Sequence, residues 1–166
     1  MSDASSDIVR LLTRELEGFR RELALFPDDG TLWRTVPGVT NSAGNLALHV
    51  AGGLQHFIGA VLGGSGYKRN RDVEFGRRSG TRAEVIAETD AALAVVRDVL
   101  PRLPKERLVG EFPEPVMGKR VRTNLFLLHL CVHAGFHLGQ AGYLRRAVTG
   151  DSSSSGPIPL EPLTER

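Results

Sequence analysis

The segment TNLFLLHLCVHAGFHLGQAGYL, residues 123–144, contains no Asp, Glu, Lys or Arg. Three of the five histidines of the chain lie in it, at positions 129, 133 and 137. Their four-residue spacing places them one turn apart on the same side of a helix. A helix that has no charged face is buried on most sides. The segment therefore predicts a core helix of an all-α protein, over about residues 124–148.

A second stretch without charged side chains, residues 42–65, holds the other two histidines, His49 and His56. Uncharged runs of this length are long enough to cross a bilayer. Both runs, however, contain Asn and Gln besides their histidines, and polar groups at that density are costly in lipid. We therefore expect two buried helices of a bundle and no association with a membrane.

Two further helices complete the predicted fold. Residues 5–25 carry apolar side chains at helical spacing, and residues 81–100 begin with the capping-box pattern of Thr81 and Glu84. The four segments predict a four-helix bundle over residues 1–150. Residues 151–166 are polar and contain proline, which predicts a flexible or surface-lying C-terminal tail.

Three connecting segments are predicted without regular helices. Residues 31–40 read as a loop, and residues 105–120 as an extended loop or short hairpin. The basic loop of residues 68–82 is expected to be a solvated surface.

Composition limits the classes of partner. The chain has 166 residues and a formal net charge of +2, from 21 Lys and Arg against 19 Asp and Glu. This balance excludes the charge stripe of a nucleic-acid-binding protein. The single cysteine, Cys131, excludes an intramolecular disulfide framework and a Cys-based zinc site. It fits a reducing compartment, and the N-terminal sequence shows no apolar signal segment, so we expect a cytoplasmic protein.

The histidine spacing predicts a metal site. His133 and His137 can share one ion, whereas His129 lies about 12 Å along the axis from His137, too far to join them. His49 and His56 are about 10 Å apart along their own helix, so only one of them belongs to the site. If the two helices are antiparallel, placing His49 opposite His133 and His137 puts His56 beside His129. We therefore expect a triad of His49, His133 and His137 and an adjacent histidine pair.

The ligand types narrow the chemistry. Neither uncharged helix offers a carboxylate, which disfavours a dinuclear carboxylate site. Three neutral imidazoles with an open position are the pattern of catalytic zinc, and Ni²⁺, Fe²⁺ or Co²⁺ accept the same donors. Asn45 and Gln140 are candidates to hold the second ring nitrogens of the ligands. His56 and His129 are candidates to support a ligand or contact a substrate, or else are structural. Trp33 is expected in the core or in a pocket wall.

The runs NLALHVAGGLQHFIG (residues 45–59) and HAGFHLGQ (residues 133–140), together with Leu32-Trp33 and Pro37-Gly38, resemble the DinB/YfiT-like superfamily. The resemblance covers about residues 8–148. It implies a four-helix bundle of up-down-down-up topology and a metal triad that maps onto His49, His133 and His137. It also implies a homodimer, since members of the family are often dimers.

Characterised relatives in that family include S-transferases that use bacillithiol, mycothiol or glutathione, and a mycothiol-dependent isomerase. Many relatives have Glu and Arg where this chain has Ala134 and Leu138. The leading hypothesis is a metal-dependent enzyme, with Zn²⁺ or Ni²⁺ as the first choices, that activates a low-molecular-weight thiol against a small electrophile. One alternative is a hydrolase that uses metal-bound hydroxide. Another is a bundle that binds a metal or small ligand without catalysis, which a closed site recruiting His56 or His129 would favour.

Overall fold

The computed structural model describes residues 4–156 and 159–164. Its described part is helical, and the β-type pairing found there consists of the isolated antiparallel bridges Glu111↔Arg122 and Val116↔Lys119. The helical elements are α1 (Ala4–Ala24), α2 (Asp29–Leu32), α3 (Ala43–Leu54), η1 (Gln55–Leu62), α4 (Arg71–Gly76), α5 (Arg82–Val99), η2 (Leu100–Arg102), α6 (Lys105–Val109), α7 (Thr123–Thr149) and η3 (Glu161–Leu163). The all-α prediction is confirmed.

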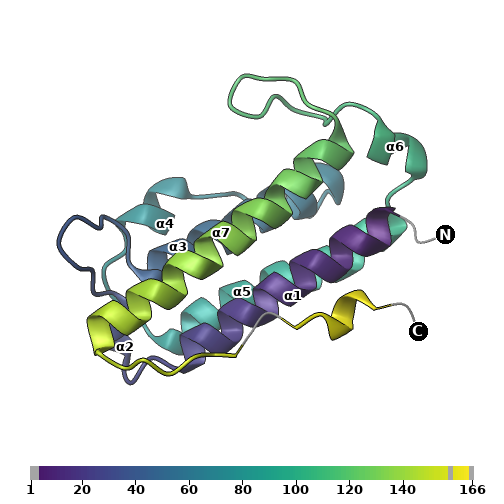
Figure 1. Cartoon of the computed structure of the whole chain (residues 1–166). Coiled ribbons are helices and arrows are strands. Elements are labelled where there is room, and N and C mark those ends of the chain that lie inside the picture. The colour runs from purple at the N-terminus through teal and green to yellow at the C-terminus, as the bar shows by residue number, and fades with distance from the viewer. Residues whose placement is uncertain (1–3, 157–158, 165–166) are drawn as a thin grey trace.

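Four long helical segments enclose the core (Figure 1). α1 packs against α5 and α7, and α3 with its extension η1 packs against α5, while α3 also contacts α7. The apolar stripe of α1 is buried as its spacing predicts, with Leu12 and Leu16 fully covered. α5 begins at the predicted capping box, in which Thr81 and Glu84 each accept a hydrogen bond from the other's backbone N–H.

α3 and α7 run in opposite directions. Near one end Leu46 of α3 lies beside Leu144 of α7, where both line a shared hollow. Near the other end the ring of Phe57, in η1, lies 4.9 Å from the ring of Phe126. This arrangement brings the middle of α3 opposite the middle of α7, where His49 meets His133.

The helix that begins as α3 ends as a π-helix. In η1 the backbone bonds reach five residues back, as in Gly63 N–H to the Ile58 carbonyl at 2.9 Å. A π-helix has a wider turn than an α-helix. Side chains after Leu54 are therefore rotated away from the positions that a regular α-helix predicts.

The prediction that residues 68–82 form a solvated loop is confirmed for the exposure of Lys68, Arg71 and Arg78 and wrong for the secondary structure and for Glu74, which is buried. Residues 68–82 contain α4, which begins at Arg71 and is capped by Asn70, whose side chain accepts the Val73 N–H at 3.1 Å. The Asn45 side chain of α3 donates to the backbone carbonyls of Glu74 at 2.8 Å and Arg77 at 2.9 Å. These bonds attach α4 to the side of α3.

The other two connections also contain short helices. α2 lies at the start of the predicted 31–40 loop, where its N-cap Asp28 accepts the Thr31 N–H at 2.7 Å. α6 precedes a hairpin-like segment, residues 111–122, that projects beyond the end of the bundle (Figure 1).

Within the described part of the chain, one helix, Ala43–Leu62, is long and apolar enough to cross a membrane, but 78% of its most apolar window is buried inside the bundle. It is a core helix of this fold. The described part of the C-terminal segment lies along α1, where Arg10 donates to the Thr164 carbonyl at 3.4 Å (Figure 1). Arg145 of α7 is fully buried and joins this segment to α1, because it pairs with Glu22 and donates to the Ser153 carbonyl.

Candidate metal centre

Three imidazoles converge between α3 and α7. The Nε2 atom of His133 lies 3.2 Å from Nε2 of His49 and 3.1 Å from Nε2 of His137. Ligand nitrogens of the three rings all lie within 4.8 Å of one another. Two nitrogens bound to one tetrahedral Zn²⁺ are about 3.3 Å apart, given Zn–N bonds of about 2.05 Å. The cluster therefore has the dimensions of a metal site.

The outer ring nitrogens of two of these histidines have acceptors. His49 Nδ1 lies 3.0 Å from Glu74 Oε2, and His137 Nδ1 lies 2.7 Å from Gln140 Oε1. A carboxylate or amide oxygen can only accept, so these two contacts favour a proton on each Nδ1. Arg69 Nη2, which can only donate, also lies 3.1 Å from His49 Nδ1 and competes with Glu74 for it. With both Nδ1 atoms protonated, both Nε2 lone pairs point at His133, whose single N–H can satisfy only one of them. Convergent lone pairs of this kind are what a cation requires, so the residues fit a bound divalent metal.

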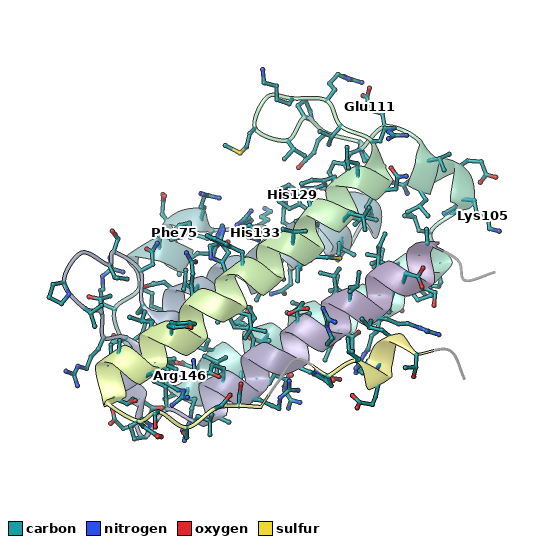
Figure 2. All side chains as sticks on the ribbon, viewed as in Figure 1. Phe75, Lys105, Glu111, His129, His133 and Arg146 are labelled. Atoms are coloured by element: carbon teal, nitrogen blue, oxygen red, sulfur yellow. The ribbon has the colours of Figure 1, made fainter. Side chains whose placement is uncertain are left out.

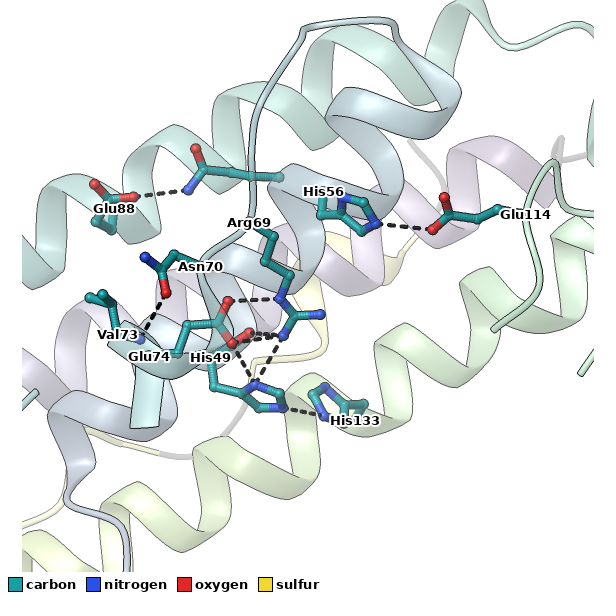
Figure 3. Close-up of polar contacts among 10 residues, drawn as sticks. His49, His56, Arg69, Asn70, Val73, Glu74, Glu88, Glu114 and His133 are labelled. Atoms are coloured by element: carbon teal, nitrogen blue, oxygen red, sulfur yellow. Dashed lines mark hydrogen bonds and ion pairs between the residues drawn. The ribbon is translucent and has the colours of Figure 1, made fainter. Parts of the chain in front are cut away.

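The Glu74 carboxylate is positioned by Arg69. Arg69 donates from Nε to Oε1 at 2.7 Å and from Nη2 to Oε2 at 2.8 Å, which is a bidentate ion pair (Figure 3). Both side chains are largely buried, with relative exposures of 14% for Arg69 and 6% for Glu74. The chain Arg69–Glu74–His49 matches the arrangement by which metalloproteins orient a ligating histidine.

Burial favours the neutral, metal-binding form of His133 and His137. Burial lowers the pKa of His133 to about 3, and the neighbouring His137 and His49 add to the effect, so this imidazole is neutral at physiological pH. Burial also lowers the pKa of His137, against the opposing hydrogen bond to Gln140. Burial alone would raise the pKa of Glu74, but the hydrogen bonds from Arg69 and His49 outweigh it and lower that pKa. The carboxylate therefore stays ionised.

Gly52 of α3 makes room for this carboxylate. A Cβ at Gly52 would lie 2.3 Å from Glu74 Oε1, whereas a Cβ at Gly53 would find its nearest neighbour, Arg69 Nη2, at 3.6 Å. We expect Gly52→Ala to displace Glu74 and to weaken Zn²⁺ binding by roughly tenfold, the scale seen when the partner of a ligating histidine is disturbed.

Gly53→Ala is the matched control for that prediction. It makes the same change one residue along the same helix and is expected to leave the affinity unchanged and to stabilise the helix slightly. Isothermal titration of both variants with Zn²⁺ gives the comparison. Equal affinities in the two variants would contradict the role assigned to Gly52.

A cavity of about 310 Å³ opens beside the triad. His49 and His133 form part of its wall, and the hairpin-like segment contributes Val116 and Met117. A larger hollow of about 540 Å³ lies toward the other end of α7 and is lined by Gln140 rather than by a ligand histidine. Of these two hollows, the smaller one is therefore the one that reaches the triad.

The predicted histidine pair is replaced by other contacts. His56 Nε2 lies 3.0 Å from Glu114 Oε1 of the hairpin-like segment, pointing away from His133 (Figure 3). His129 instead stacks on Phe126 and lines the cavity, and it projects from the same side of α7 as His133 (Figure 2). The prediction assumed a regular α-helix between His49 and His56, but the π-helix begins at Gln55.

Two other candidates lie farther from the metal centre than expected. Asn45 forms a capping box with Ser42 and bonds the α4 backbone, so its link to His49 runs through Glu74. Trp33 packs against Gly44 and donates from Nε1 to the Gly80 carbonyl at 2.7 Å, in the core rather than in the cavity wall.

The remaining positions singled out on α7 face the core. Ala134 and Leu138 are both buried, and Leu138 packs on Gly18 of α1. Cys131 is buried as well, and desolvation raises the pKa of its thiol to about 12. A thiol with that pKa is not a nucleophile at neutral pH.

Sequence reasoning missed Arg69 and Glu74. Both lie in the segment that was expected to be solvated. The signal that points to them is Asn70 followed by Asp72 and Glu74, which is the pattern of a helix start with acidic residues in its first turn.

Comparison with known proteins identifies the family. No curated protein matches the chain by sequence. The family model of the DinB superfamily matches residues 11–141, a range that contains the whole triad, Glu74 and Gln140. The chain therefore belongs to the DinB superfamily.

Proposed function

We propose that this protein is a metal-dependent transferase that joins a low-molecular-weight thiol to a small electrophile. The observation that carries the proposal is the convergence of three imidazole nitrogens beside a cavity. Zn²⁺ and Ni²⁺ are the first choices for the ion, and Fe²⁺ or Co²⁺ accept the same donors. The thiol, which glutathione, mycothiol or bacillithiol represents, is proposed from the family resemblance.

The protein's own groups orient and protect the reacting atoms. A divalent ion on three neutral ligands keeps its full charge and lowers the pKa of a bound thiol or water. Glu74 and Gln140 hold the rings of His49 and His137 in the tautomer that presents Nε2. The apolar cavity wall, which includes Val50 and Phe57, limits the access of water. In the proposed reaction the thiol sulfur bonds to an electrophilic carbon, the leaving group departs with its electron pair, and the thiol proton passes to solvent.

The test is an assay with and without each component. Protein loaded with Zn²⁺ or Ni²⁺ is incubated with 1-chloro-2,4-dinitrobenzene and each thiol in turn. We expect a thioether product that requires both metal and thiol. Turnover of an ester or amide substrate by the loaded protein without thiol would replace the proposal with a metal-dependent hydrolase. Stoichiometric metal without turnover of any of these substrates would favour a bundle that binds without catalysis.

We also propose that the protein forms a homodimer through α7. Large exposed apolar side chains form one stripe along this helix: Leu125, Leu128, Val132, Phe136 and Tyr143. The first four are three or four residues apart, and Tyr143 follows Phe136 after two further turns. A helix normally buries such a stripe against another surface. A second copy presents the same stripe, so the surface is self-complementary across a two-fold axis.

A charge in this stripe is expected to separate the dimer. Val132 is 72% exposed, so Val132→Glu leaves the monomer fold intact. Across a two-fold axis the two carboxylates would repel, and we expect the dissociation constant to rise by roughly a hundredfold or more. Sedimentation velocity measures this change. Val109→Glu, at another exposed valine outside α7, is the control. A wild-type monomer, or an unchanged dimer in Val132→Glu, contradicts the proposed interface.

Two further proposals concern the topology of the bundle and the cellular location of the protein. We propose the up-down-down-up order, supported by antiparallel α3 and α7 and by the long return of residues 63–81 along the bundle before α5 begins (Figure 1). We propose a cytoplasmic location, supported by a single, buried and free cysteine.

A further inference from the structure

The cavity beside the triad has an unusual charge composition. Its wall is mainly apolar, and its described lining contains the cationic side chains Arg69 and Arg71 but no Asp or Glu. The apolar residues of the wall come from four elements and are Val50, Leu54, Phe57, Val116, Met117, Phe126 and Leu130. An apolar pocket with a few convergent polar groups is typical of a small-molecule site.

The two arginines differ in whether their N–H groups are free to bind a ligand. Arg69 is occupied by its bidentate pair with Glu74. Arg71 forms no ion pair among the described residues, and its guanidinium lies 5.0 Å from the centre of the Phe75 ring. Stacking on an aromatic face positions a guanidinium while leaving its N–H donors free. The Phe75 ring also lies 4.6 Å from the His49 ring. Phe75 therefore lies between the Arg71 guanidinium and the triad.

We infer that this cavity binds a small organic anion, with its carboxylate on Arg71, its apolar body against Phe57 and Phe126, and its other end toward His49 and His133. The inference rests on the proposed function, for which it defines the class of organic substrate. A volume of about 310 Å³ is at the lower end of the range of small-molecule sites, about 300 to 1,000 Å³, and suits a molecule with one aromatic ring.

Binding of a matched pair of probes tests the anion site without any turnover. 3-Phenylpropanoate and 3-phenylpropanol share an apolar body and differ in the carboxylate. Their dissociation constants are measured by NMR titration of the metal-free protein, so that the carboxylate cannot gain affinity by binding an ion. We expect the carboxylate to bind more tightly than the alcohol by roughly three- to tenfold, as for one charge-assisted hydrogen bond.

Variants assign that preference to one residue. Arg71→Gln is expected to abolish it, and Arg71→Lys to keep part of it, because the charge remains. Lys68→Gln makes the same change of charge three residues away, outside the cavity lining, and is expected to leave the preference intact. Equal binding of the two probes by the wild type, or a preference that survives in Arg71→Gln, overturns the inference.

These results are separable from those of the thiol assay. A carboxylate preference that depends on Arg71, in a protein that transfers no thiol, keeps the anion site and removes the proposed reaction. Thiol transfer by a protein that binds both probes equally keeps the reaction and removes the anion site.

Discussion

His133→Ala is expected to abolish metal binding. Nε2 of His133 lies 3.1 to 3.2 Å from the Nε2 atoms of the other two histidines and is the centre of the cluster. Without it, only two ligands remain, His49 on α3 and His137 on α7. An open catalytic site has three protein ligands. Elemental analysis of protein purified without a histidine tag is expected to fall from one ion per chain to a background level.

His129→Ala is the control for this prediction. It removes a histidine one turn away on the same face of α7, which lines the cavity but lies outside the triad. We expect it to keep a full complement of metal. Stoichiometric metal in His133→Ala would rule out the triad, and a loss of metal in His129→Ala would show that the ligand set is different from the one described.

Glu74→Gln is expected to weaken both metal binding and the fold. Gln keeps the size of the side chain but loses the negative charge that holds His49 Nδ1–H and the Arg69 guanidinium. Removing the group that orients a ligating histidine lowers metal affinity by about 10- to 100-fold. Leaving Arg69 largely buried without its partner is expected to lower the free energy of unfolding by about 3 kcal/mol. Zn²⁺ titration and urea denaturation of the metal-free protein measure the two effects separately.

Asp72→Asn makes the corresponding change of charge on the same short helix. Asp72 is exposed and lies in the first turn of α4, so its loss is expected to change stability by only a few tenths of a kcal/mol. Equal metal affinity in Glu74→Gln and Asp72→Asn would show that the carboxylate of Glu74 does not support the site.

The triad could be predicted from the sequence because its geometry is mostly local. The spacing of His133 and His137 on one helix follows from helical periodicity alone. The choice of His49 rather than His56 rested on an antiparallel arrangement of α3 and α7 and on the family resemblance, and His49 Nε2 does lie 3.2 Å from His133 Nε2. Burial of α3 was visible as the absence of charged residues from its segment, and every residue of this helix is buried. The same expectation is wrong for one side of α7, which exposes Leu128, Val132 and Phe136 although residues 123–144 carry no charge.

What escaped prediction depends on tertiary contacts. Arg69 and Glu74 lie in a run of basic residues that is typical of a solvated surface, and only the contact of α4 with α3 turns them inward. His56 was misplaced because the π-helix has no clear signal in its sequence and changes the direction of the side chains that follow. The local pattern thus located the ligands, while the groups that support them were set by packing between distant segments.

The positions of the two ligand helices have a consequence for the whole chain. His49 and His133 are 84 residues apart, so a shared ion ties the first half of the polypeptide to the second, much as a covalent cross-link would. A ligand that binds only the folded state adds about 2.7 kcal/mol of stability when its free concentration is about 100 times its dissociation constant. We therefore expect the conformational stability of this protein to rise with the free metal concentration of its surroundings.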